Sequence, residues 1–209
     1  MKTFKEFNNI NESKINEDSN GLKGVKEYRD DLTPEIIQKD FPWLLRAKFK
    51  DAVIGLDEDD RCLIWHEGTW IDGNWKNGTW LNGWWKDGTW EDGDWYNGEW
   101  RNGIWRNGIW KNGIWKCGIW KNGEWWEGIW ECGSWEFGAW YGGTWKKGTW
   151  LDGWWKNGTW QNGTWQNGTW QNGIWEDGKW RKGDWKKGKI YDGESKKTID
   201  SKIPPKSMS

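Results

Sequence analysis

A five-residue repeat, W-x-x-G-x, runs without interruption from Trp65 to Trp185 and constrains the fold more than any other feature of the sequence. Tryptophan occupies all 25 of these positions, and glycine follows each one by three residues, from Gly68 to Gly188. A straight strand cannot bury this pattern, because side chains five residues apart point to opposite faces. A helix would scatter the tryptophans around its circumference and would lose about 1 kcal/mol at each glycine.

The chain must therefore turn once per unit. The residue before the glycine is Asn or Asp in 16 of the 25 units. This pair suits a turn, because glycine accepts positive φ angles freely and Asn or Asp tolerates them. Of the 209 residues 29 are Trp and 30 are Gly, whereas Leu, Ile, Val and Phe are scarce. The sequence predicts an all-β repeat architecture of about 25 units, with the regularly spaced indoles as its core.

One architecture that fits is a quadrilateral β-solenoid, in which each turn bends the chain by a right angle and four units close a coil. The segments Gly78-Thr79-Trp80 and Gly103-Ile104-Trp105 resemble the pentapeptide-repeat family, in which a small residue, any residue and a large apolar residue follow one another. The resemblance implies a square solenoid with parallel coils. That family normally uses Ala with Leu or Phe, but Trp plus Gly fills roughly 290 Å³ and Phe plus Ala roughly 280 Å³.

The alternative is a rolled antiparallel meander of three-residue strands such as Thr79-Trp80-Leu81. The segment Trp75-Lys76-Asn77-Gly78 is similar to the W-x-N-G turn of MORN repeats, although the MORN unit is several times longer. Two similar segments, Gly78–Trp95 and Gly148–Trp165, lie 14 units apart, an even number that suits successive hairpins. Against the meander, several glycines follow Lys, Glu, Phe or Cys, which are poor in a type I′ turn. We favour the solenoid because it buries every indole.

Four segments are expected along the chain. Residues 1–32 are polar and predicted to be flexible. Residues 33–64 should hold a short helix over about 34–39, capped by Thr33 and limited by Pro42, and then a hairpin from Lys48 to Trp65 that covers the open edge of the repeat. Residues 65–193 form the repeat domain, in which Ile190 replaces the last tryptophan. Residues 194–209 are predicted to be a flexible tail.

No catalytic, cofactor-binding or metal-binding constellation is predicted, and we expect no enzyme. His66 is the single histidine, so any Ser-His-Asp or Cys-His chemistry would depend on it. Cys62 and His66 are too few ligands for a metal. The three cysteines are an odd number without a CxxC spacing, which indicates free thiols in a reducing compartment. Cys117 and Cys132 occupy equivalent positions, and we interpret them as replacements for the usual Asn.

Composition gives few hints about partners. The net charge of −1 provides no general attraction to nucleic acid or to a membrane surface. From Lys179 onward there are ten Lys or Arg against four Asp or Glu, which we interpret as a solvated tail rather than a nucleic-acid site. Neither a membrane span nor a cofactor is expected. Trp84, Trp126 and Trp154 fall outside the repeat register, so we expect them to face outward and to be available for contact with a partner or ligand.

The first twelve residues carry a separate signal. Met1-Lys2-Thr3-Phe4-Lys5-Glu6-Phe7, followed by Ile10-Asn11-Glu12, resembles the capsid-targeting peptide of T-even-type phage internal head proteins. The resemblance implies cleavage between Glu12 and Ser13 and carriage into the phage head. It predicts a non-enzymatic structural or interaction protein of a tailed phage, located in the virion or host cytoplasm, with head or scaffold proteins as partners. The alternatives are a host-directed module resembling pentapeptide-repeat inhibitors and a carbohydrate-binding or adhesion repeat.

Overall fold

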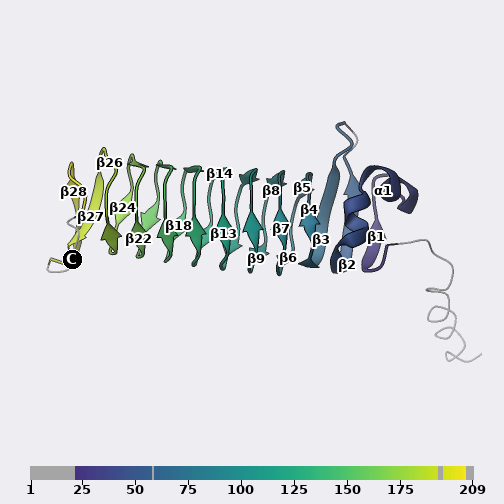
Figure 1. The fold of residues 1–209 in the computed structure, drawn as a ribbon. Helices are drawn as coiled ribbons and strands as arrows, with labels where there is room; N and C mark the ends of the chain where they lie inside the picture. Colours follow the sequence, from purple (N-terminus) through teal and green to yellow (C-terminus); the bar gives the residue numbers. More distant parts are fainter. Residues whose placement is uncertain (1–21, 58, 193–194, 206–209) are drawn as a thin grey trace, which may run out of the picture.

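The repeat winds into a straight rod of stacked coils (Figure 1). The computed structural model describes residues 22–57, 59–192 and 195–205. A small helical cap covers the end of the rod where the repeat begins, and a pair of antiparallel strands lies at the other end. The repeat strands between the two ends pair in parallel, which confirms the β-solenoid and excludes the antiparallel meander.

Each coil contains three repeat units and not the expected four. Trp65 pairs with Trp80, and Trp70 pairs with Trp85, so the register advances by 15 residues per coil. The solenoid is therefore triangular. We call its three sides face A, which begins at Trp65, face B, which begins at Trp70, and face C, which begins at Trp75.

The strands of each face follow one another along the rod. Face A contains part of β3 (Leu63–Asp72), β5 (Thr79–Trp80), β8 (Asp94–Trp95), β11 (Ile109–Trp110), β14 (Glu124–Trp125), β17 (Ala139–Trp140), β20 (Trp154–Trp155), β23 (Thr169–Trp170) and β26 (Asp184–Trp185). Face B contains the rest of β3, β6 (Trp84–Trp85), β9 (Glu99–Trp100), β12 (Ile114–Trp115), β15 (Ile129–Trp130), β18 (Thr144–Trp145), β21 (Thr159–Trp160), β24 (Ile174–Trp175) and β27 (Gly188–Asp192). Face C contains β4 (Asn74–Trp75), β7 (Thr89–Trp90), β10 (Ile104–Trp105), β13 (Ile119–Trp120), β16 (Ser134–Trp135), β19 (Thr149–Trp150), β22 (Thr164–Trp165) and β25 (Lys179–Trp180).

The core consists of indoles in three columns. The ring of Trp105 stacks on Trp90 and Trp120 in the neighbouring coils, with centroids 4.8 Å apart and planes within 6° of parallel. The same ring meets Trp100 and Trp110 edge to face at 6.0 and 5.9 Å. The stacking distance matches the spacing of adjacent strands, about 4.8 Å, so hydrogen bonding and ring stacking share one repeat along the axis. All the regularly spaced tryptophans are buried, which confirms the predicted core.

The corners of the triangle require glycine. Gly103 has a φ of 121°, a conformation that residues with a side chain rarely adopt. A Cβ at this position would collide with the carbonyl oxygen of Gly88 in the preceding coil. The backbones on both sides of this corner stay paired, because Arg101 N before it donates to Trp85 O at 2.8 Å and Ile104 N after it donates to Gly88 O at 2.9 Å. Glycine therefore makes the turn and also permits close stacking of successive coils.

The position of glycine explains the triangular cross-section. Four sides were expected because both Gly and Trp were taken to fill the interior of the coil. In the structure Gly lies at the corner, and Trp is the one large side chain that each unit places inside. A square encloses about 1.7 times as much area per side as an equilateral triangle, so one indole per side would leave a square coil underpacked. Three indoles in mutual edge contact fill the smaller cross-section.

The cap contains the expected helix and hairpin. Helix α1 (Pro34–Asp40) begins at the Thr33 cap, whose Oγ1 accepts a hydrogen bond from Ile36 N at 3.3 Å. A 3-10 helix, η1 (Pro42–Arg46), leads into β2 (Lys48–Leu56), which pairs antiparallel with β3. Trp43 meets Trp75 edge to face at 5.2 Å, and Phe49 stacks on Trp70 at 6.0 Å. These aromatic rings cover the first coil, which would otherwise expose its indoles to water.

The ends of the described chain differ from the flexible segments that were expected. Strand β1 (Val25–Tyr28) pairs in parallel with β2, and Leu32 is buried in the cap. At the other end β28 (Lys197–Ser201) pairs antiparallel with β27. Strand β28 is mostly exposed, so main-chain hydrogen bonds to a sheet edge hold it in place, whereas Val25 and Tyr28 of β1 also pack, partly buried, against the core. Composition alone could not reveal strands of this kind.

The glycine corner gives a direct test of the fold. We expect Gly103→Ala to destabilise the protein by about 2 kcal/mol or more, because alanine would be strained at this φ and its Cβ would press on Gly88. Denaturant unfolding followed by circular dichroism measures the change. The matched control is Arg106→Ala on the exposed surface of the next corner, expected to change stability by less than about 0.5 kcal/mol. Equal stability of Gly103→Ala and the control would contradict the corner geometry.

Candidate functional site

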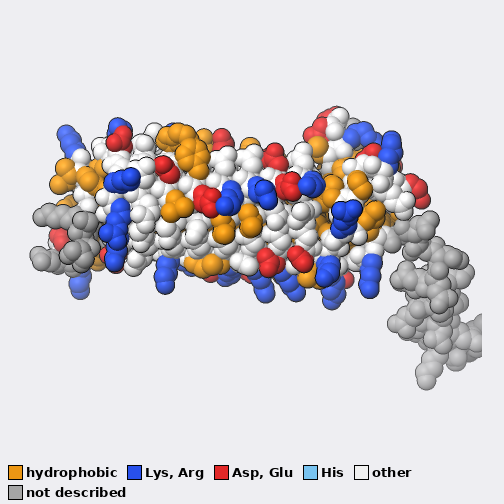
Figure 2. Space-filling model, in the orientation of Figure 1, with side chains coloured by type: hydrophobic (Ala, Val, Ile, Leu, Met, Phe, Trp, Pro, Cys, Tyr) orange, Lys and Arg blue, Asp and Glu red, His pale blue; other side chains and the backbone are white. Residues whose placement is uncertain are grey.

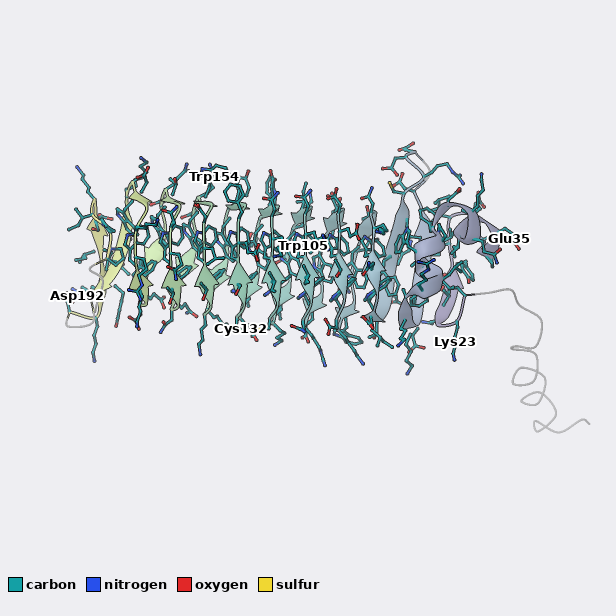
Figure 3. All side chains as sticks on the ribbon, in the orientation of Figure 1. Lys23, Glu35, Trp105, Cys132, Trp154 and Asp192 are labelled. Carbon is teal, nitrogen blue, oxygen red and sulfur yellow. The ribbon has the colours of Figure 1, made fainter. Side chains whose placement is uncertain are left out.

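The residues on either side of each core tryptophan point outward. Since successive coils are in register, side chains 15 residues apart form columns that run along the rod (Figure 3). On face A one such column is rich in aromatic rings and lies beside the corner that leads to face B. Its members in the middle of the rod are Leu81, Tyr96, Lys111, Trp126, Tyr141 and Lys156.

Side chains in this column contact one another directly. The rings of Trp126 and Tyr141 stack with centroids 5.0 Å apart and planes 22° from parallel. Lys111 Nζ lies 5.5 Å from the ring centroid of Tyr96 and 5.7 Å from that of Trp126, so its ammonium group lies between two aromatic rings. Trp126 Nε1 donates a hydrogen bond to Glu124 Oε2 at 3.1 Å. These contacts order the rings without burying them.

A second pair of rings extends the aromatic surface on face A. Trp154 follows Ala139 in the neighbouring column, and its ring meets Phe137 edge to face at 5.1 Å. Figure 3 labels Trp154 at the edge of the rod, whereas Trp105 lies among the indoles at its centre. We define the aromatic platform as the five exposed rings on and beside face A, namely Tyr96, Trp126, Phe137, Tyr141 and Trp154. They are between 36% and 48% exposed.

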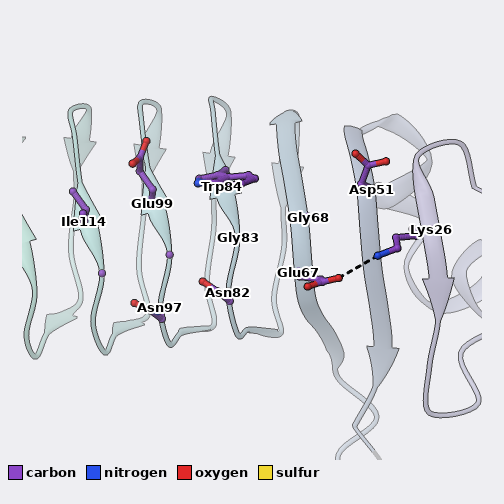
Figure 4. Close-up of a pocket in the computed structure, with 12 residues that line it drawn as sticks. Lys26, Asp51, Glu67, Gly68, Asn82, Gly83, Trp84, Asn97, Glu99 and Ile114 are labelled. Atoms are coloured by element: carbon purple, nitrogen blue, oxygen red, sulfur yellow. Dashed lines mark ion pairs between the residues drawn. The ribbon is translucent and has the colours of Figure 1, made fainter.

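Trp84 lies apart from the platform, on face B. It is the most exposed tryptophan, at 57%, and it lies in an open groove of about 500 Å³ near the cap (Figure 4). Asn82, Asn97 and Glu99 line the groove on the repeat side. On the cap side Lys26 Nζ forms an ion pair with Glu67 Oε1 at 3.5 Å. The groove thus combines one large apolar ring with amide and carboxylate groups.

Charged side chains also pair between coils. Lys76 Nζ lies 2.8 Å from Glu91 Oε1 in the next coil. Lys121 Nζ likewise lies 2.7 Å from Glu136 Oε1. The Glu131 carboxylate lies between two lysines in neighbouring coils, and the Nζ atoms of Lys116 and Lys146 are each 3.2 Å from one of its oxygens. Burial would raise the pKa of Glu131, but hydrogen bonds from the two lysines lower it below its ordinary value. Figure 2 shows such charges beside hydrophobic patches on the same surface of the rod. Exposed pairs of this kind add little stability.

The structure places the three predicted outward tryptophans on two faces. Trp126 and Trp154 both lie on face A, two coils apart, and Trp84 is separate on face B. Their exposure follows the repeat register, and their role in partner contact stays a prediction. Tyr96, Phe137 and Tyr141 were not predicted, because residues about 15 apart can be recognised as neighbours only once the coil size is known. The expected processing site at Glu12 and Ser13 lies outside the described residues.

His66 Nε2 lies 3.4 Å from Asp30 Oδ2 in the cap, away from Cys117 and Cys132. Within residues 22–57, 59–192 and 195–205, no group of three or more His, Cys, Asp and Glu side chains is arranged to hold a metal ion. No helix in this same part of the chain is long and apolar enough to cross a membrane.

No family model, curated protein or solved structure matches the chain. The likenesses to pentapeptide repeats and to MORN turns therefore remain resemblances of short motifs. The repeat solenoid and its tryptophan core are established by the geometry of the chain itself.

The division between core and outward indoles can be tested in solution. We expect iodide to quench only a minor part of the tryptophan fluorescence, because the regularly spaced indoles are inaccessible. Replacement of Trp84, Trp126 and Trp154 by phenylalanine should remove most of the quenchable fraction while the circular dichroism spectrum stays unchanged. Strong quenching in this triple variant would show that core indoles reach water.

Proposed function

We propose that the chain is a non-enzymatic interaction protein whose rigid rod presents the aromatic platform to an extended carbohydrate. The observation that carries the proposal is the set of five exposed rings, several in mutual contact, on a surface that a rigid core holds in place. Single exposed aromatic residues are ordinary, but several exposed rings gathered on one side of a molecule favour a binding surface.

The chemistry of the platform suits a sugar. One face of a pyranose ring carries C–H groups that pack on an aromatic ring, while its hydroxyl groups need hydrogen-bond partners around that ring. Trp126 and Tyr141 stack on each other and Lys111 lies over Trp126, so these two rings offer mainly their outer edges to a sugar. Glu124 and Lys111 supply an acceptor and a donor beside them. The mixture of charges around the platform does not resemble the basic groove that follows a nucleic-acid backbone.

The direction of the platform favours a polymer over a single sugar. The column from Tyr96 to Tyr141 runs along the rod axis, and each coil moves it forward by one strand spacing of about 4.8 Å. A saccharide chain lying along this column would meet successive rings, whereas a monosaccharide would meet only one or two. The groove beside Trp84 on face B is a separate and smaller surface of similar chemistry.

A glycan array followed by titration against the best soluble polysaccharide tests the proposal. We expect Trp126→Ala to weaken binding by about fivefold or more, since contact with one aromatic side chain contributes about 1–3 kcal/mol in comparable surfaces. Leu151→Ala is the matched control, because Leu151 is exposed at the equivalent position of face C. Trp84→Ala tests whether the separate groove on face B contributes to binding of the polysaccharide.

Two outcomes would contradict the carbohydrate proposal. One is the absence of binding to any glycan by the folded wild-type protein. The other is an equal loss of affinity in Trp126→Ala and Leu151→Ala, which would show that the platform is not the contact surface.

A structural role in a tailed-phage particle is the second candidate function. It is supported by the likeness of Met1–Phe7 and Ile10–Glu12 to a capsid-targeting peptide. A rod of this kind is compatible with packaging, because its core is closed along its length and both ends of the repeat carry additional strands. The two functions do not exclude each other, since a virion protein can carry a carbohydrate-binding surface.

Mass spectrometry of purified virions tests this second function. We expect the chain to be present with a new N-terminus at Ser13, because cleavage should follow Glu12. Glu12→Gln should leave the chain uncut and is the matched variant. Absence of the chain from virions, or its presence with residues 1–12 intact, would refute packaging with processing and would leave the carbohydrate proposal untouched.

A further inference from the structure

Cys117 and Cys132 face each other across two successive coils. Cys117 lies in the corner between β12 and β13, and Cys132 lies in the corresponding corner between β15 and β16. Both corners are in register, since Cys117 N donates to Arg101 O and Cys132 N donates to Lys116 O, each at 3.0 Å. The two Sγ atoms are 2.6 Å apart. The 15-residue coil alone brings these thiols together, which the sequence did not reveal.

This arrangement meets the geometric needs of a disulfide. Adjacent strands lie about 4.8 Å apart, which falls within the Cα separation of about 4.4–6.8 Å that disulfides span. The sulfur atoms need to approach only to the bond length of about 2.05 Å, a shift that small side-chain rotations can supply. Both residues are half-buried at the surface of the rod, so a small reagent can reach them.

Other corners show what such a pair replaces. Asn122 Nδ2 donates to Asn107 Oδ1 at 3.2 Å, and Asn167 Nδ2 donates to Asp152 Oδ2 at 3.0 Å. The residue before glycine thus links adjacent coils by side-chain hydrogen bonds. A cysteine at one corner would merely replace an asparagine, but cysteines at two consecutive corners of one column can replace this hydrogen bond by a covalent bond.

We propose that Cys117 and Cys132 form a redox modification site, at which a low-molecular-weight disulfide such as glutathione disulfide oxidises the pair to a reversible cross-coil disulfide. One cysteine thiolate attacks glutathione disulfide, forms a mixed disulfide and releases one glutathione. The second cysteine loses its proton and attacks the protein sulfur of the mixed disulfide, which releases the other glutathione. The protein loses two electrons and two protons, and glutathione disulfide gains them.

The surroundings of the pair affect the rate of this reaction. Burial and the contact with Cys117 raise the pKa of the Cys132 thiol to about 11, so little thiolate is present there at neutral pH. Since the thiolate is the attacking species, oxidation should accelerate as the pH rises. The product would close a loop of 15 residues in the middle of the rod. Coil-by-coil separation of the repeat would then be blocked at this point.

Peptide mapping of the full chain tests the site. The protein is incubated with excess glutathione disulfide, alkylated without reduction and digested with trypsin, which cleaves after Lys116, Lys121 and Lys146. We expect residues 117–121 to be linked to residues 122–146, with the mass of both peptides less two hydrogens. Cys62 should remain available to the alkylating reagent, and dithiothreitol should reverse the link.

Variants distinguish the pair from general thiol oxidation. Cys117→Asn and Cys132→Asn install the residue that is usual at this corner, so both variants are expected to fold. Each should accumulate a mixed disulfide with glutathione on its remaining partner and no link between coils. Oxidised wild type should show slower unfolding in denaturant than the reduced form, and the double Asn variant should show no such difference.

Two results would overturn the proposal. One is the absence of the linked peptides in folded protein after prolonged oxidation at alkaline pH. The other is a yield of links that involve Cys62 equal to the yield of the link between Cys117 and Cys132.

Discussion

The edge-to-face and stacked packing of indoles is the interaction on which the rest of the structure depends. Many buried indole nitrogens in the described chain have no hydrogen-bond acceptor, and Trp165, which donates to Lys182 O, is one of the few that do. An unpaired buried N–H costs about 1–3 kcal/mol. Burial of about 200 Å² per indole contributes about 5 kcal/mol, and contact between rings adds more. The aromatic terms therefore outweigh the unpaired donors, and the triangle persists with an almost wholly aromatic interior.

Local features of the sequence were sufficient to predict the turns at the repeat glycines up to Gly183, the tryptophan core, and the helix and hairpin of the cap. These depend on one unit or on adjacent residues, such as Thr33 before Pro34. The number of sides is a property of the closed coil, and no single unit encodes it. Four sides were expected because glycine was taken to fill the interior, whereas Gly103 lies at a corner against Gly88. The strands β1 and β28 were missed because both lie in mainly polar segments, where a short strand that pairs with a sheet edge leaves little hydrophobic pattern.

The candidate site was predictable only in part for the same reason. Trp126 and Trp154 could be recognised as outward because they break the five-residue register. Their neighbours could not, since Tyr141 and Phe137 reach them across a coil boundary. The contact between Cys117 and Cys132 was missed for the same reason, because these residues also meet across one coil. In this solenoid the core residues recur every five residues, whereas neighbours on the surface are about 15 residues apart. The five-residue pattern of the sequence therefore reveals the core but not the surface columns.

The triangular coil also fixes how the chain can change in length. A gain or loss of three units adds or removes one complete coil and leaves every column in phase. A gain of a single unit between Trp126 and Tyr141 would rotate everything downstream by one side, so that the stacked rings would end on different faces while the core stayed intact. The indoles in the core thus pack in the same way for any number of units, but the surface columns stay aligned only when the number changes by a multiple of three. Insertions and deletions that keep the columns aligned must come in multiples of fifteen residues.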